Sequence, residues 1–128
     1  MAEPHTQHGS ALAAVSNAVV SLHKEQFGRG PTHSRADYAG ADVLVCTLEN
    51  ALLPAERALI QMGNDQDVRD SRTHLQAATA QLFINAAEAH TGRKVRAFAS
   101  ALDPGAGVVF EVFALEPLDG RAATDGRV

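Results

Sequence analysis

The chain has 128 residues, and 45% of them are hydrophobic, which is enough to build one compact domain around a continuous core. Fifteen acidic against eleven basic side chains give a formal net charge of −4, which argues against a protein that coats nucleic acid through its overall field. Any anion-binding site must therefore be a local basic patch, and a nucleic-acid partner is not expected.

The cysteine content and the hydropathy pattern predict a soluble cytoplasmic protein. Cys46 is the only cysteine, and within VLVCTL it has the surroundings of a small buried side chain in a reducing compartment. No apolar run reaches the roughly 18 residues that a membrane span needs. The first residues carry no charged segment followed by a hydrophobic one, so they do not resemble a signal peptide. We therefore expect no direct insertion into a membrane.

The N-terminal part of the chain predicts a flexible tail, a helix and a hairpin. Residues 1–8 are polar and are expected to form the tail. A helix is predicted from Ser10, which can act as an N-cap, to Gly28, and its apolar stripe comprises Leu12, Val15, Val19, Leu22 and Gln26. Two strands, THSRADY at 32–38 and DVLVCTLE at 42–49, follow as a hairpin.

Two helices and a second hairpin are predicted in the C-terminal part. Pro54 suits the first turn of a short helix that ends at Gly63. Asn64 or Asp65 can cap a long helix that reaches Thr91-Gly92, with a stripe of Val68, Leu75, Ala78, Leu82, Ala86 and Ala89. Strands at 94–102 and 107–116 flank Asp103-Pro104-Gly105, where Pro fixes one dihedral and Gly permits a positive φ. Residues 118–128 are expected to form a second flexible tail, which leaves a single domain over 9–117.

This order, αββααββ, predicts an α+β fold with a four-stranded antiparallel sheet and helices on one face. Each half contains a helix that ends in Gly-Arg (28–29 and 92–93) and two strands that end in TLEN or ALEP. The shared pattern suggests an internal duplication, although the few identities are also compatible with coincidence. If the halves fold alike, their two basic corners are expected to lie near one another at one end of the sheet.

The inner strands predict a partner. Val43 to Cys46 and Val108 to Phe110 offer apolar side chains to both faces of the sheet, whereas a solvated face should alternate with polar residues. A chain of this length has few residues left to cover the second face. We therefore expect a homodimer that buries sheet surface, or a larger partner that does the same.

Two basic stretches are candidate anion-binding corners, because clustered Arg and Lys suit phosphate or carboxylate and glycines expose backbone N–H groups. The candidate ligand residues are Lys24, Gly28, Arg29, Gly30, Thr32, Arg35, Thr91, Arg93 and Lys94. The alternative is purely structural: the glycines end helices and make turns, and the cations favour the helix macrodipole.

Other chemistry finds little support in the sequence. The six histidines include no HExxH and no close pair on a predicted helix face, so no metal is expected. Cys46 in mid-strand should have a raised pKa and low reactivity. Glu49 and Glu116 end equivalent strands and could approach as a carboxylate pair, but solvated strand ends are the simpler interpretation. We therefore expect no catalytic residues and no cofactor.

Several segments resemble the bacterial MpsC-like family, once described only as a domain of unknown function and named after a sodium-translocating, membrane-potential-generating system. They are LHKEQFGRGPTHSRAD, VLVCTLENALLPAE, HTGRKVRAFASALDP and VFEVFALE, within about residues 11–117. The resemblance implies a soluble accessory protein of a system whose other, membrane-embedded subunits carry the ions. The sequence departs from the family pattern at Leu53, where Thr or Ser is expected, and the lost cap should cost about 1 kcal/mol.

Two functions of different kinds fit these observations. The first is a non-catalytic accessory or regulatory protein-interaction module of a membrane ion or bicarbonate system. The alternative is a small-anion or nucleotide-binding sensor that uses Arg29, Arg35, Arg93 and Lys94 around the glycine-containing corners.

Overall fold

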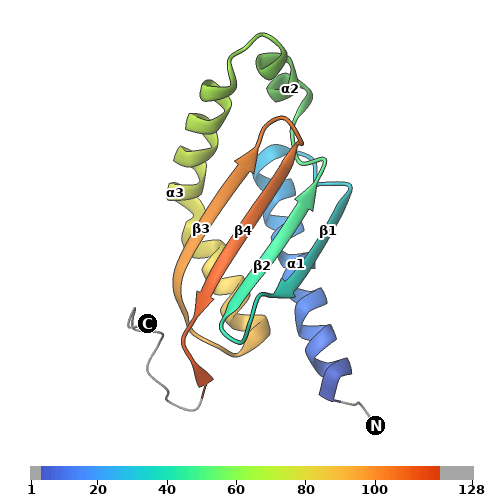
Figure 1. Ribbon diagram of the computed structural model, residues 1–128, viewed down its shortest axis with the longest axis vertical. Helices are drawn as coiled ribbons and strands as arrows, with labels where there is room; N and C mark the ends of the chain where they lie inside the picture. Colours follow the sequence, from blue (N-terminus) through green and yellow to red (C-terminus); the bar gives the residue numbers. More distant parts are fainter. Residues whose placement is uncertain (1–3, 119–128) are drawn as a thin grey trace.

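The computed structural model describes residues 4–118, which form three helices and one sheet (Figure 1). In chain order the elements are α1 (Pro4–Phe27), β1 (His33–Tyr38), β2 (Val43–Glu49), α2 (Pro54–Gln61), α3 (Asp65–Thr91), β3 (Val95–Asp103) and β4 (Val108–Leu115). This order confirms the predicted α+β fold with the order αββααββ.

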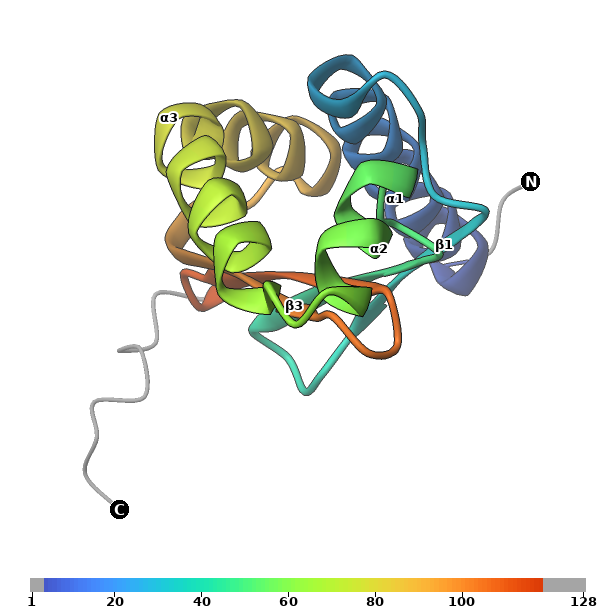
Figure 2. The ribbon, with the colours of Figure 1, turned by 90° about the horizontal axis from the view of Figure 1, so that it is seen from above.

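All neighbouring strands are antiparallel, and they lie in the order β1-β2-β4-β3. The three helices cover one face of the sheet, and no other described element covers the opposite face (Figures 1 and 2). The central pair consists of β2 from the first half and β4 from the second, so each half contributes one inner and one outer strand. The arrangement is that of two similar units joined antiparallel at their inner strands.

Most element boundaries follow from glycine and proline. Gly28 and Gly92, at the C-terminal ends of α1 and α3, have φ of 81° and 70°, which is the left-handed conformation predicted for helix stops. In the second hairpin the positive φ falls on Gly107, at 69°, and not on Gly105 as expected. Gly107 N–H donates to the Asp103 carbonyl at 2.9 Å and so closes the turn.

The N-terminal boundary differs from the prediction. Helix α1 begins at Pro4, so residues 4–8, which were expected to belong to a tail, are helical. Proline is tolerated in the first turn of a helix because its missing N–H has no intrahelical partner there. Residues 1–3 and 119–128, the remaining parts of the two expected tails, lie outside the described residues.

The core lies between the helices and the sheet. Val15 and Val19 of α1 are fully buried, as predicted, over Leu44, Leu48 and other inward side chains of the sheet. On the α3 side, the rings of Phe83 and Phe98 stack with centroids 5.8 Å apart, and those of Phe98 and Phe113 are tilted at 4.9 Å.

The predicted apolar stripe of α3 is confirmed at Val68 but is wrong in its phase beyond that residue. Leu75 and Leu82 are 36% and 51% exposed, whereas Phe83 and Ala87, which were not in the stripe, are buried. Arg72 and Gln76, which lie on the same face as Val68, are half-buried. A hydrophobicity pattern cannot select this face because polar side chains occupy its middle.

Gly92→Ala should lower the free energy of unfolding by about 1 kcal/mol, because a side chain is strained in the left-handed conformation. No atom lies within 4 Å of a Cβ added at Gly92, so the cost would come from the backbone alone. Gly9→Ala is the control, since Gly9 is helical and also has nothing within 4 Å. It should raise stability by about 0.5 to 1 kcal/mol in the same urea titration, and equal effects of both substitutions would contradict this account.

Candidate functional site: a polar core and an open sheet face

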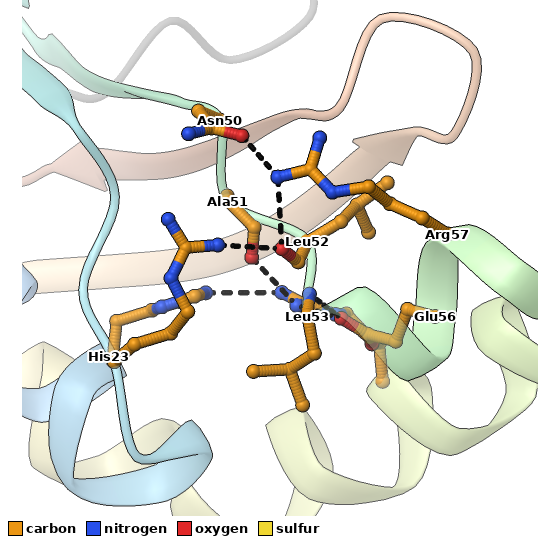
Figure 3. A network of polar contacts seen from close by, with 9 residues as sticks. His23, Asn50, Ala51, Leu52, Leu53, Glu56 and Arg57 are labelled. Atoms are coloured by element: carbon orange, nitrogen blue, oxygen red, sulfur yellow. Dashed lines mark hydrogen bonds and ion pairs between the residues drawn. The ribbon is translucent and has the colours of Figure 1, made fainter.

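A buried cluster of polar side chains around Arg72 joins the three helices. Figure 3 labels three residues that contact Arg72, namely His23, Ala51 and Glu56. The Arg72 guanidinium donates to both carboxylate oxygens of Glu56, at 2.8 and 2.7 Å, and to the Ala51 carbonyl at 2.9 Å. It also lies 3.0 Å from Nε2 of His23 and 4.1 Å from the centre of the Phe27 ring. One side chain of α3 therefore holds α1, α2 and the segment before α2 together.

The segment before α2 is held mainly by arginines. Arg29 donates to the Leu52 carbonyl at 2.7 Å, and Arg57 donates to the Asn50 side chain (Figure 3). The Leu53 N–H donates to Oε1 of Glu56 at 2.8 Å, so Glu56 supplies one half of a capping box although Leu53 has no side-chain cap. The cap lost at Leu53 is thus partly compensated.

Burial and charge set the protonation of this cluster. Burial alone would raise the pKa of Glu56, but hydrogen bonds from Arg72 and from the Leu53 N–H lower it below its ordinary value. Burial, followed by the positive charge of Arg72, lowers the pKa of His23 to about 4. His23 is therefore neutral at pH 7. Because Arg72 can only donate, Nε2 of His23 accepts, and its proton lies on Nδ1.

A second buried carboxylate lies on the sheet beneath this cluster. Glu111 of β4 is 4% exposed and is flanked by Cys46 of β2 and Ser100 of β3 on the helix-covered face. Burial raises the pKa of Glu111 to about 7, and the Ser100 hydrogen bond and the Arg72 charge offset this only in part. Burial, with a contribution from Glu111, also raises the pKa of Cys46 to about 12, in the direction expected for a thiol in mid-strand.

On the uncovered face of the sheet, the side chains of the three adjacent strands β2, β4 and β3 are largely apolar. Directly paired residues share a face, so the registers define its rows. One row runs Asp37, Val45, Val112, Ala99, and the next runs Arg35, Thr47, Phe110, Ala101. Only the edge strand β1 contributes charges to these two rows. We call the set Val43, Val45, Phe110, Val112, Ala114, Ala97, Ala99 and Ala101 the open face.

The structure does not bring the two candidate anion corners together. Lys24, Gly28, Arg29, Gly30, Thr32 and Arg35 lie near the end of β2, where Thr32 N–H donates to the Glu49 carbonyl at 3.0 Å. Thr91, Arg93 and Lys94 lie at its beginning, where Arg93 pairs with Asp42 at 2.6 Å. The expectation of a shared corner was wrong, because antiparallel joining of two similar halves puts equivalent points at opposite ends.

The arginine side chains of these corners have structural partners. Arg29 binds the Leu52 carbonyl, and Arg93 binds the carbonyls of Ala41 and Glu116 at 2.7 and 2.9 Å. Arg35 forms an exposed ion pair with Asp37 at 3.0 Å. Thr91 Oγ1 donates to the Ala87 carbonyl at 2.7 Å. Anion binding by these residues remains a prediction that the geometry does not strengthen.

The remaining candidate groups are also separated. Glu49 lies opposite His33 in the strand register at one end of the sheet, whereas the backbone N–H of Glu116 donates to the Lys94 carbonyl at the other end, so the two side chains form no carboxylate pair. Between residues 4 and 118, no three His, Cys, Asp or Glu side chains gather as a metal site. In the same range, no helix is both long and apolar enough to span a bilayer.

Comparison with known proteins decides the family. A family model described as Na+-translocating membrane potential-generating system (MpsC) matches residues 7–117. The chain belongs to the MpsC family. No curated protein and no solved structure matches it. The match starts slightly before the segments that showed the resemblance, within α1 of this MpsC-family chain.

Reading the sequence alone missed His23, Arg72 and Glu111 of this MpsC-family protein. Glu111 had a usable signal: it is the single charge within VVFEVFAL, at a position whose neighbours two residues away, Val109 and Phe113, are core. Arg72 had none, because every residue from Arg69 to His74 is polar. Its role depends on Glu56, which lies sixteen positions earlier in the sequence.

Proposed function

We propose that this protein is a non-catalytic cytoplasmic accessory module of the membrane system that names its family, and that it acts as a homodimer formed through the open face. Membership of the MpsC family supports the association with a Na+-translocating system. The open face supports the dimer, and it is the observation on which the proposal rests.

The open face departs from what water tolerates on a sheet. An antiparallel sheet covered on one side normally carries polar residues on the other. Here Phe110 is 37% exposed, and Val45 and Val112 lie side by side across the central strands. Contiguous apolar surface of this kind usually marks an interface. The face therefore favours a permanent protein partner over solvent.

The shape of the open face favours a second copy of the chain as that partner. Large side chains, among them Val45, Phe110 and Val112, form a ridge along β2 and β4. The alanines 97, 99 and 101 form a shallow trough along the adjacent β3. Two copies related by a two-fold axis would each place the ridge in the partner's trough, at the spacing of about 10 Å typical of packed sheets. Charged β1 would lie at the rim.

Phe110→Asp tests this dimer. A carboxylate at the centre of the apolar interface would be buried without a partner, so the dimer should weaken by at least about a hundredfold, corresponding to about 3 kcal/mol. Light scattering at micromolar concentration should give a dimer mass for the native chain and a monomer mass for the variant.

Leu82→Asp is the matched control, because Leu82 is 51% exposed on α3, on the helix-covered side. It should leave the dimer intact. A monomer mass for the native chain would remove the homodimer, and dissociation by Leu82→Asp as readily as by Phe110→Asp would place the interface elsewhere.

A further inference from the structure

A groove on the helix side of the molecule lies next to a small cavity that contains the buried Glu111. The groove lies between α3 and β3, has a volume of about 370 Å³, and is lined on its α3 wall by Gln66, Arg69, Thr73 and Gln76. A small inner cavity of about 30 Å³ adjoins it and is lined by His23, Gln26 and Glu111 among others. Arg72, Gln76, Ser100 and Val109 line both spaces, so the two share a wall.

The inner cavity ends at an unsatisfied acceptor. Glu111 is only 4% exposed, so water does not reach its Oε1 freely. This oxygen nevertheless has no hydrogen-bond partner among the described residues. Leaving a buried polar atom without a partner costs free energy, and such atoms are rare in native structures. The volume admits one small group, about the size of a water molecule. That group must donate a hydrogen bond or carry a positive charge.

We propose that the groove and the inner cavity bind a small organic amine, whose ammonium group occupies the cavity and donates to Oε1 of Glu111. The rest of the molecule would lie in the groove beside Thr73 and Gln76. This site is on the face opposite the proposed dimer interface, so it does not depend on the proposed function.

The surrounding charges favour an ammonium group over an anion. Arg72 of α3 is the positive side chain nearest the cavity, and its charge is matched by both oxygens of Glu56 of α2. His23 of α1 and Cys46 of β2 are neutral at pH 7, and Ser100 of β3 does not titrate. Glu111 therefore lacks a cation of its own. An ammonium group would supply that charge, whereas an anion would meet a second carboxylate.

The site is tested by following the backbone amide signals in NMR spectra while ethanolamine is added at constant ionic strength. Saturable shifts are expected at Gln76, Ser100 and Val109. Because the amine binds the ionised carboxylate, and burial raises the pKa of Glu111 to about 7, the affinity should be roughly tenfold lower at about pH 6 than at about pH 8. Glu111→Gln, which keeps the shape of the side chain, should abolish the shifts.

Glu49→Gln is the matched control, since it makes the same change at the exposed end of β2, and it should bind as the native chain does. If Glu111→Gln loses the native spectrum, Gln76→Leu at the junction of groove and cavity serves instead and should also abolish the shifts. Ethylene glycol, acetate and Na+ are the comparison probes. Equal binding of ethylene glycol, binding of acetate alone, the same shifts with Na+, or no shift with ethanolamine would each overturn the proposal.

Discussion

Arg72→Met should lower the free energy of unfolding by about 3 to 5 kcal/mol, which is the usual cost of removing one partner of a buried ion pair. The Arg72 and Glu56 side chains are only 10% and 11% exposed, so solvent cannot replace the lost guanidinium. The substitution would leave the Glu56 carboxylate without its counter-charge and the Ala51 carbonyl without its donor. Methionine retains the apolar stem, so the loss would report the polar contacts.

Urea denaturation followed by circular dichroism measures this loss, and Arg69→Met is the control. Arg69 lies on the same helix and is exposed, and its side chain donates to the Leu102 carbonyl at 3.1 Å. Its replacement should cost less than about 1 kcal/mol. Adding Glu56→Gln to Arg72→Met should restore part of the stability, because the buried charge disappears. A loss below about 1 kcal/mol for Arg72→Met would show that the cluster does not hold the helices together.

The element order could be predicted because the residues that begin and end the helices act through their own local backbone geometry. Gly28 and Gly92 end helices through their own backbone freedom, and Pro54 begins one for the same kind of reason. The apolar character of the open face was also predictable, since Val43 to Cys46 leaves no room for alternation. These signals need no knowledge of distant residues.

The positions of the basic corners could not be predicted in this way, because they depend on how the halves join. The pairing of β2 with β4 is antiparallel, with Val45 opposite Val112, and this sends Arg29 and Arg93 to opposite ends. The sequence pattern contains the repeat but not the relation between its copies.

The prediction of which face of α3 is buried failed for a related reason. Arg72 faces the core because Glu56, contributed by another helix, neutralises it there. A pattern based on hydrophobicity assigns any arginine to the surface, so it rotated the helix toward Leu75 and Leu82. Polar residues that are buried in pairs become visible only once both partners have been placed in space.

Glu111→Gln should stabilise the protein, in the absence of added amines, by an amount that grows with pH. Burial raises the pKa of Glu111 from its ordinary value of 4.5 to about 7, so the folded state holds this proton more tightly than the unfolded state. Its contribution is fully present below about pH 4.5 and is lost as the pH rises through about 7. The native chain should lose about 3 kcal/mol relative to the variant across this window.

His23 opposes this trend and explains why the variant is needed to reveal it. Its pKa is lowered from 6.5 to about 4, so its contribution is present above about pH 6.5 and is lost as the pH falls through about 4. In the native chain the two slopes therefore nearly cancel between about pH 4.5 and 6.5, whereas the stability of Glu111→Gln should rise with pH there. Urea titrations of both proteins from about pH 5 to pH 8 give the difference directly, with Glu49→Gln as the control that should run parallel to the native chain. A difference that stays constant over this range would mean that Glu111 is ionised, and therefore solvated or paired, throughout.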